Sequence, residues 1–577
     1  MRLAPVVLAT LCVAALFMGL DRVGFLDWRE ARDAQVAREM LRYREPLTPL
    51  YGRAALAEKP VLAYVPEVLA RRLAPDSPLR SRQMRASFAV FLVLGTASLG
   101  ARHFGLRAGW LAGAVLVTSI ALPLAARMDG TQLLGTLLGW VGCAGFADVV
   151  FGRSAGRDAR LIVTYGVLGA TLASVGPLAA LWPLGGMALY LALTRSREAW
   201  HGARPLAGLA IMAGVALPWY GAMVERHGSL FLASAASFPY AAEVRGPWAT
   251  GAMLAIPFLV VGFFPWSAML PDAMLHAATW WRAVRRPLLR SLHAAKARTG
   301  ADPNSREQRE EAAAHYLIAC LFAALVPVAL YPGPPLTAAL PALPAAALLC
   351  GRFLDHLFED AERVAGALTR AVRTLALIGT LAAVLLAFTA PRVAGASPEL
   401  RLLASLLLLT SWAPLLADLI GRRRLAAALI ALPVALGAPV VSLRVLPAME
   451  EHLSTRSVAA ALDMAAPPLA PLVLVEAPPP TLRLYGGHNF VVPDSLGRAL
   501  PELRAADGMT YLAFRPARER EVAHAVSAPL EILLRSPSMV LARVEASRVS
   551  SAWPAVPTPF TPARHDKISL TPRPRTP

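Results

Sequence analysis

Charged residues are scarce in this sequence of 577 residues: they account for 16% of the chain, whereas apolar residues account for 56%. Soluble globular domains usually carry about 25% charged residues. A chain with this balance has too little polar surface to keep several domains in solution. The composition therefore excludes a soluble protein.

Lysine is nearly absent, since it occurs only at Lys59, Lys296 and Lys567 while arginine supplies the rest of the 57 basic residues. A bias of this size is typical of genome composition, so a lysine that is present is a candidate for a specific role. The formal net charge of +19 would suit nucleic acid. The basic residues lie mostly in short loops between apolar runs, however, and no aromatic residues are interleaved with them. We therefore expect no nucleic-acid partner.

Cysteine is equally rare, and the four cysteines Cys12, Cys143, Cys320 and Cys350 lie in or beside apolar segments. No two of them have the spacing of a metal or redox motif, which excludes a disulfide framework and a zinc site. The bulky Leu11 precedes Cys12, where a lipoprotein signal needs a small residue. Because no cleavage site follows either, the first apolar run is expected to remain as a membrane span.

What the sequence does have is a series of apolar runs, each long enough to cross a hydrocarbon layer about 30 Å thick. We predict about thirteen such spans, at residues 3–20, 84–101, 108–126, 131–151, 161–175, 178–194, 205–223, 249–270, 315–331, 336–351, 372–390, 401–420 and 425–445. The predicted fold class is an all-α polytopic membrane protein with a small C-terminal α/β domain outside the membrane.

The positions of the arginines predict how the spans are oriented in the membrane. With a cytoplasmic amino terminus, the inner loops hold clusters such as Arg153, Arg157 and Arg160, and the segment 272–314, which satisfies the positive-inside rule. We expect the latter segment to contact anionic membrane lipids. The loop 21–83 is rich in arginine although it lies outside. Cations retained on the outer face indicate an anionic, phosphate-bearing ligand.

Three regions follow from this reading. Residues 1–446 form the membrane module, whose outer loop 21–83 contains an amphipathic helix over 30–43 that is expected to lie along the membrane surface. Residues 447–546 form the external α/β domain, with strands at 472–475, 490–492, 510–514, 530–534 and 540–544. Residues 547–577 are rich in proline, serine, threonine and arginine, and we expect a disordered tail.

Several motifs follow one another in a fixed order. Residues 27–41 read DWREARDAQVAREML, and PLTP at 46–49 and EKPVL at 58–62 come next. Later motifs are LPWY at 217–220, FPWS at 264–267 and ALP at 339–341. This set resembles the GT-C membrane glycosyltransferases, and in particular the aminoarabinose–lipid A transferase branch, which is related to protein O-mannosyltransferases. The resemblance covers about residues 1–360, and the span count with an outer C-terminal domain agrees with it.

The resemblance implies transfer of a sugar, with inversion, from a polyprenyl-phosphate carrier to an envelope acceptor. The acceptor (a lipid A-like lipid, a protein or a glycan) stays open, as does the sugar. The reaction would take place at the outer, periplasmic face of a bacterial cytoplasmic (inner) membrane. No cofactor beyond the lipid-linked donor is implied, and a divalent metal is left open.

The chemistry needs a carboxylate that orients or deprotonates the acceptor and cations that hold the phosphate. Glu30 is the first candidate for the carboxylate. Asp27 and Asp33 lie one helical turn from it, and Asp129 stands at the outer end of the fourth span, where it also suits a helix N-cap. The competing interpretation is that Glu30 and Asp33 pair with neighbouring arginines on a solvated helix.

Lys59 is the best candidate for contact with the phosphate because a compact ammonium acts as a point charge. Its alternative is an interfacial lysine that extends from a turn to water. Arg32 matches the arginine of the motif, and Arg245 matches the arginine of a later outer loop. Each of these arginines has a structural alternative as well.

The sequence departs from the family at three positions. Arg29 stands where the family has the first acid of a pair, and Val175 and Pro334 stand where relatives often have lysine. These departures favour a second hypothesis, in which the chain is a catalytically degenerate relative that binds lipid-linked sugar or holds envelope enzymes together.

Overall fold

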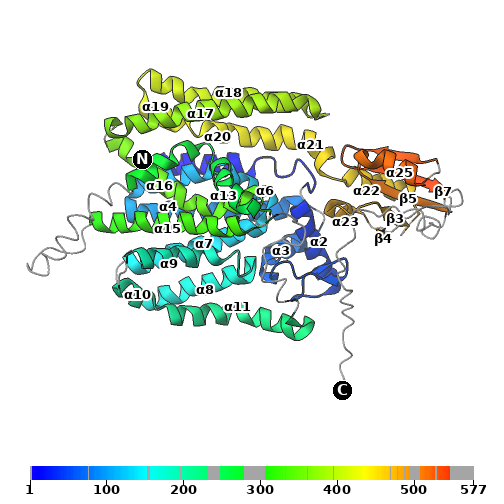
Figure 1. Ribbon diagram of the computed structural model, residues 1–577, viewed down its shortest axis with the longest axis horizontal. Coiled ribbons are helices and arrows are strands. Elements are labelled where there is room, and N and C mark those ends of the chain that lie inside the picture. Colours follow the sequence, from blue (N-terminus) through cyan, green and yellow to red (C-terminus); the bar gives the residue numbers. More distant parts are fainter. Residues whose placement is uncertain are drawn as a thin grey trace, which may run out of the picture.

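A computed structural model describes most of the chain as an elongated bundle of helices with a small sheet domain at one end (Figure 1). The described residues are 3–26, 28–75, 77–151, 156–194, 197–229, 231, 247, 249–277, 306–331, 333–359, 361–393, 395–467, 470–476, 478–486, 489–492, 507–526 and 529–545. The predicted disordered tail lies outside them, as does most of the predicted segment 272–314.

Within the described residues, nine helices are long and apolar enough to cross a membrane. They are Pro78–Phe104 (α4), Gly130–Phe151 (α7), Arg157–Val175 (α8), Trp200–His227 (with α11, Pro205–His227), Glu310–Leu330 (in α15, Arg306–Leu330), Leu336–Phe358 (η4, Leu336–Ala342, with α16, Leu343–Glu359), Ala365–Arg392 (α17, Ala361–Thr389, with η5, Ala390–Arg392), Ser397–Leu419 (α18) and Arg423–Leu453 (α19, Arg423–Leu429; α20, Leu432–Val440; η6, Val441–Val445; α21, Leu446–Leu453). The chain is a multi-pass membrane protein.

Four further apolar elements complete the bundle. Two are bent pairs, Leu106–Val117 (α5) with Ala121–Met128 (α6), and Ala249–Gly262 (α13) with Trp266–Ala277, and counting each pair as one span gives eleven. Two are shorter, Ala4–Phe17 (α1, Ala4–Cys12, with η1, Val13–Phe17) and Leu181–Thr194 (α9), which is followed by α10 (Arg197–Ala203). Every predicted span overlaps one of these elements, but the count of about thirteen spans stays a prediction.

The breaks in the two bent pairs face each other. Ile120 N donates to Phe264 O at 3.1 Å, and Trp266 Nε1 donates to Thr118 Oγ1 at 2.9 Å. Backbone groups freed by a break within the apolar layer must find partners in the protein. The FPWS motif therefore joins the second break to the first one.

Small residues allow the central helices to pack closely. A Cβ atom on Gly109 of α5 would lie 2.3 Å from Ala97 O of α4, and one on Gly351 of α16 would lie 2.6 Å from Ala112 N of α5. Such close approach of backbones is typical of helix pairs in membranes. It keeps α4, which carries part of the site described below, fixed against its neighbours.

The outer loop is a compact cap on one end of the bundle. It contains α2 (Trp28–Tyr43), the hairpin β1 (Leu50–Tyr51) and β2 (Ala54–Ala55), the turn η2 (Val61–Ala63) and α3 (Val65–Leu73). The predicted surface helix is therefore present, but it is buried more deeply than its charges suggest, because it is packed between the membrane helices and the C-terminal domain (Figure 1).

The C-terminal domain is a five-stranded sheet in the order β4-β3-β5-β7-β6. Its strands are β3 (Pro471–Leu474), β4 (Asn489–Val491), β5 (Met509–Phe514), β6 (Glu531–Arg535) and β7 (Val540–Glu545), and its helices are α22 (Arg456–Ala465), α23 (Pro480–Tyr485) and α25 (Glu519–Val526). β3 is parallel to β4 and β5, whereas β7 is antiparallel to β5 and β6. The predicted class, a helical membrane protein with a small C-terminal α/β unit, is confirmed.

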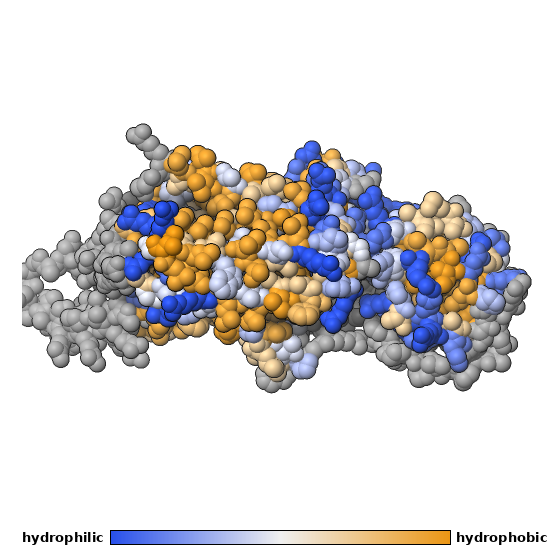
Figure 2. Space-filling model, turned by 90° about the horizontal axis from the view of Figure 1, so that it is seen from above, coloured by the Kyte–Doolittle hydropathy of each residue, from blue (hydrophilic) through white to orange (hydrophobic). Residues whose placement is uncertain are grey.

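The distribution of hydrophobic residues on the surface agrees with the division into a membrane bundle and a C-terminal domain. Figure 2 shows hydrophobic residues over the helical bundle and a band of hydrophilic residues where the bundle meets the C-terminal domain. Hydrogen bonds cross the junction from α23 to the outer loop: Tyr485 Oη accepts from Phe25 N at 2.6 Å, and Arg38 Nη1 donates to Leu484 O at 2.7 Å. The C-terminal domain is thus attached directly to α2.

Candidate active site

One face of α2 covers a cluster of buried charges at the end of the membrane helices. Glu30, Asp33 and Ala37 share this face because residues three and four apart lie one above the other on a helix. α3, α4, α6, the start of α7, η4 and the loop before η2 contribute the remaining side chains. The apolar layer begins next to the cluster, so each charge needs a partner within the protein.

Glu30 is held by two arginines of α4. Arg82 donates through Nε and Nη2 to the two carboxylate oxygens at 2.8 and 2.9 Å, and Arg85 Nη2 donates to Oε1 at 2.6 Å. Burial would raise the pKa of Glu30, but the charges and hydrogen bonds of Arg82 and Arg85 outweigh burial and lower this pKa. A carboxylate with a lowered pKa and both oxygens engaged is a weak proton acceptor.

Lys59 lies beneath α2 and is fully buried. Its Nζ donates to Asp33 Oδ1 and to Thr131 Oγ1, both at 2.6 Å, and it lies 4.6 Å from the centre of the Tyr64 ring. The lysine is therefore an interior group at the site and does not extend from a turn to water. Two of the predicted site residues, Lys59 and Asp33, are in direct contact.

Asp129 and Arg29 form a second buried ion pair, with 3.1 Å between Oδ2 and Nη1. Thr337 Oγ1 donates to the same oxygen at 2.7 Å, while Gln132 N donates to Oδ1 at 3.1 Å. The last bond is the N-cap contact of α7. Arg29, the departure from the family motif, thus neutralises the predicted acid of the fourth span.

Arg32 pairs with the glutamate that precedes Lys59. Its Nε donates to Glu58 Oε2 at 2.7 Å, and its guanidinium lies 4.5 Å from the centre of the Tyr51 ring. This contact connects α2 to the EKPVL motif and supports the position of Lys59. Arg32 is buried with its partner.

Two predicted site residues, Asp27 and Arg245, lie outside the described residues. At the other two departures from the family pattern, Val175 and Pro334, the side chains are buried. Val175 Cγ1 lies 2.3 Å from the position that a Cβ on Gly135 would occupy, and Pro334 lies just before η4. Val175 therefore packs α8 against α7, where a lysine would need a charged partner.

Sequence reasoning missed several members of the cluster. Arg85 lies inside a predicted span, and this is a signal in itself, since a charge at membrane depth is costly and therefore functional or paired. Arg127 donates to the backbone oxygens of Ala15, Pro123 and Met18 at 2.9 to 3.1 Å. Glu67 accepts from Ser81 Oγ at 2.7 Å, and burial raises its pKa despite the nearby arginines.

The cluster is closely packed. A cavity of about 20 Å³ lies beside Asp33, Glu67 and Arg85, and it has room for about one water molecule. No group of three or more histidine, cysteine or acidic residues within the described part of the chain is arranged to hold a metal ion. The groups suited to chemistry here are therefore carboxylates, guanidinium groups and one ammonium.

The fold is similar to that of solved structures of ArnT. The crystal structure of ArnT from Cupriavidus metallidurans in the apo state matches with a TM-score of 0.70 and 18% identity over 95% of this chain and 99% of that one. ArnT bound to undecaprenyl phosphate matches with a TM-score of 0.71 and 18% identity over 93% and 97% of the two chains. No family model matches the sequence, and no curated protein matches it. The likeness confirms the GT-C fold that the motifs predicted.

Proposed function

We propose that this chain is a glycosyltransferase that takes a sugar from a polyprenyl-phosphate carrier and transfers it, with inversion, to an envelope acceptor at the outer face of a bacterial cytoplasmic membrane. The observation that carries the proposal is the contact between Lys59 and Asp33, a fully buried ammonium on a carboxylate at 2.6 Å. It occurs in the fold of ArnT, a protein that has been crystallised with undecaprenyl phosphate.

Lys59 is the proposed phosphate contact. The carrier phosphate would take the place of Asp33 beside Nζ, because a charge-assisted hydrogen bond to phosphate is as strong as one to a carboxylate. This exchange would release Asp33 when the donor arrives. The net positive charge of the surrounding arginines also favours a phosphate over a neutral ligand.

Asp33 is then the carboxylate best suited to the acceptor. Its side chain is 13% exposed, against 1% for Glu30 and 4% for Asp129, and it borders the small cavity that Glu30 also lines. The acceptor hydroxyl attacks the anomeric carbon while the bond from this carbon to the phosphate oxygen breaks. The proton passes to Asp33, and the carrier leaves as polyprenyl phosphate. Attack from the side opposite the phosphate inverts the anomeric carbon.

The test is turnover of a labelled polyprenyl-phosphate sugar by the full-length protein in nanodiscs, with release of polyprenyl phosphate as the readout. Asp33→Asn should reduce turnover by about 10²-fold or more and leave carrier binding in place. Arg535→Gln, on an exposed strand of the C-terminal domain, is the matched control and should behave as wild type. Turnover by Asp33→Asn at the wild-type rate would remove Asp33 from the mechanism.

A second candidate function is binding of a lipid-linked sugar without transfer. The ion pair between Arg29 and Asp129 favours it, because the family has an acid at the position of Arg29. Carrier binding with no release of polyprenyl phosphate, for any envelope lipid, protein or glycan acceptor offered, would support this candidate and reject the transferase.

A further inference from the structure

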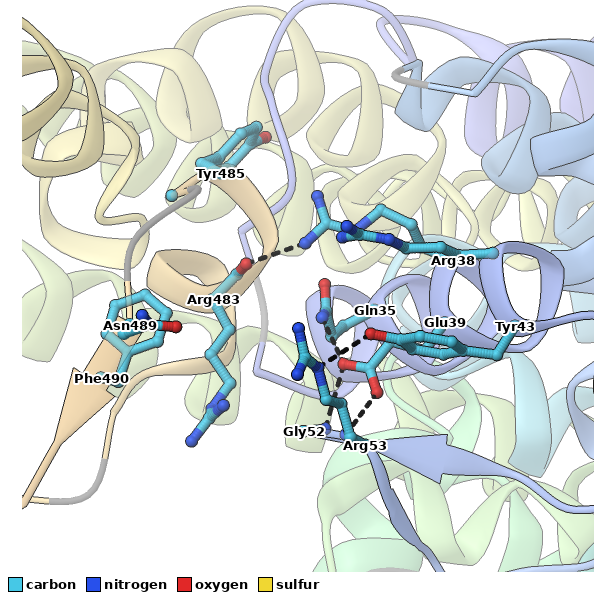
Figure 3. A pocket seen from close by; sticks show the side chains of 12 residues that line it. Gln35, Arg38, Glu39, Tyr43, Gly52, Arg53, Arg483, Tyr485, Asn489 and Phe490 are labelled. Atoms are coloured by element: carbon cyan, nitrogen blue, oxygen red, sulfur yellow. Dashed lines mark hydrogen bonds between the residues drawn. The ribbon is translucent and has the colours of Figure 1, made fainter. Parts of the chain in front are cut away.

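A cleft of about 490 Å³ opens on the face of α2 that is turned away from the charge cluster (Figure 3). Its volume falls within the range of about 300–1,000 Å³ that is typical of sites for small molecules. One wall is α2 with the β1–β2 hairpin, and the other is α23 and β4 of the C-terminal domain. All of these elements lie outside the candidate membrane spans.

The cleft is strongly basic. Four arginines line it, Arg38, Arg42, Arg53 and Arg483, together with a single carboxylate, Glu39. That carboxylate is already engaged, since it accepts from Gly52 N and Arg53 N of the hairpin, each at 3.0 Å. The lining therefore carries an excess of positive charge that would attract an anion.

Two polar atoms in the lining are buried without a hydrogen-bond partner among the described residues: Gln35 Oε1 and Arg483 Nε. Gln35 is 6% exposed, and its Nε2 donates to Glu39 Oε1 at 2.6 Å, which fixes the orientation of its amide. In Figure 3 the Gln35 oxygen points away from Glu39, on the side of Arg38. A buried polar atom without a partner is costly, so a ligand that donates to Gln35 and accepts from Arg483 would be stabilised here.

Aromatic rings line the same space. Phe490 of β4 and Tyr43 of α2 stand on opposite walls, and the Arg483 guanidinium lies 5.3 Å from the centre of the Phe490 ring. The face of an aromatic ring is partly negative and suits the polarised C–H face of a sugar as well as a cation. The cleft thus offers surfaces for a sugar ring beside guanidinium groups for an anion.

We propose that this cleft is a second binding site, for a sugar unit that carries phosphate. Arginine is the residue best shaped to hold phosphate oxygens in pairs, Gln35 Oε1 would accept a sugar hydroxyl, and Phe490 would cover the ring. A soluble sugar phosphate and the phosphorylated headgroup of an envelope glycolipid offer the same chemistry. Where the bound unit belongs to the acceptor, this assignment rests on the proposed transfer reaction, but the site itself does not.

The site is separate from the proposed carrier site. Gln35, Arg38, Glu39 and Arg42 follow the spacing of one helix face, and this face is opposite the one that carries Glu30. Lys59 does not line the cleft. Substitutions in the cleft and at Lys59 should therefore have different effects.

The experiment is saturation-transfer NMR on the full-length protein in nanodiscs, with glucosamine 6-phosphate, glucosamine and inorganic phosphate as probes. The sugar phosphate should bind at least about tenfold more tightly than either fragment, with transfer to its ring protons. Arg483→Gln and Arg53→Gln, one on each wall, should each weaken binding by about tenfold or more, the loss expected for a charge-assisted hydrogen bond. Arg535→Gln should leave it unchanged.

Competition by a phosphorylated glycolipid added to the nanodisc would identify a lipid headgroup as the source of the sugar phosphate, and lack of competition would identify a soluble one. Binding that survives both cleft substitutions would overturn the proposal. So would binding that is lost in Lys59→Ala, because it would then occur in the buried cluster. Loss of donor turnover with sugar phosphate binding intact would reject the transfer reaction and leave this site standing.

Discussion

The Arg29 guanidinium and the Asp129 carboxylate form a buried ion pair that joins the outer loop to the fourth predicted span, with 3.1 Å between Nη1 and Oδ2. Thr337 of η4 donates to the same carboxylate oxygen. Three segments far apart in the sequence therefore meet at one carboxylate. The departure from the family motif is part of the packing of this protein.

We expect this pair to be strongly coupled. Arg29→Gln should lower the free energy of unfolding by about 3–5 kcal/mol, since removing one member leaves a buried charge. The double substitution Arg29→Gln with Asp129→Asn should recover much of the loss, as a double-mutant cycle in denaturant would measure. A coupling energy below about 0.5 kcal/mol would show that the two residues act independently.

Glu30 and Glu67 should respond in opposite ways to neutralisation. Glu30→Gln removes the partner of Arg82 and Arg85 and should lower the thermal unfolding midpoint at pH 7, with about 3–5 kcal/mol lost. Glu67→Gln removes a carboxyl whose pKa is raised by burial and keeps an acceptor for Ser81. Its midpoint should be unchanged or higher. Equal destabilisation by the two substitutions would contradict the opposite pKa shifts.

The contributions of Glu30 and Glu67 to the free energy of unfolding should depend on pH in opposite directions. The folded pKa of Glu30 is lowered, so its stabilisation is present above the unfolded value of about 4.3 and is lost as the pH falls through the folded value. The folded pKa of Glu67 is raised, so its contribution is most favourable below about 4.3 and declines as the pH rises through the folded value. Unfolding curves of each variant and wild type across this window would measure both trends.

Turnover gives a separate test of Glu30. If Glu30 is the base, Glu30→Gln reduces turnover by about 10²-fold or more even in molecules that remain folded. If Asp33 has this role, the folded fraction of Glu30→Gln keeps most of its turnover. The activity is therefore to be divided by the folded protein concentration, measured by size-exclusion chromatography.

Carrier binding should depend on the shape of the side chain at position 59 as well as on its charge. Lys59→Ala should weaken carrier binding by about tenfold or more, because a charge-assisted contact contributes about 1.5–3 kcal/mol. Lys59→Arg should recover only part of it, since a planar guanidinium does not fit a fully enclosed position beside Asp33 and Thr131. Wild-type binding by Lys59→Ala, measured with a labelled polyprenyl phosphate, would move the phosphate site elsewhere.

The orientation in the membrane is a further prediction. The predicted odd number of spans and the arginine distribution place the loop after Asp21 and the domain beyond about residue 446 outside the cytoplasm. Periplasmic reporters fused after Asp21 and after Leu500 should both be active, and cytoplasmic reporters at the same places inactive. A cytoplasmic result at Leu500 alone would remove one span from the predicted set.

Local patterns in the sequence were enough to predict the apolar helices of the bundle, helix α2 and the strands of the C-terminal sheet, but not the β1–β2 hairpin or the helices of the C-terminal domain. All five strands of the C-terminal sheet overlap the predicted segments, because alternating apolar residues between turn formers are a local signal. Helix α2 was predicted from its spacing, and Lys59 was singled out by the rarity of lysine. The apolar runs predicted the fold class, and the order of the motifs predicted the GT-C fold.

Contacts between segments far apart in the chain could not be predicted from the sequence. Nothing in one sequence links Glu30 to Arg82 and Arg85 or brings Arg38 to the carbonyl of Leu484, since these partners meet only after the helices pack. The competing interpretation, a solvated helix α2, is wrong for the same reason: α2 is packed between the membrane helices and the C-terminal domain. The cleft between α2 and α23 likewise depends on how two distant segments meet.

Helix α2 is held on both of its sides by ion pairs and hydrogen bonds. Glu30 and Arg29 fix one face to the membrane helices, and Arg38 fixes the other to α23. If the C-terminal domain turns relative to the bundle, it either breaks the bonds of Arg38 or rotates α2 about its own axis. Such a rotation would pull Asp33 away from the ammonium of Lys59. A displacement of the small domain would therefore reach the contact between Lys59 and Asp33 through α2.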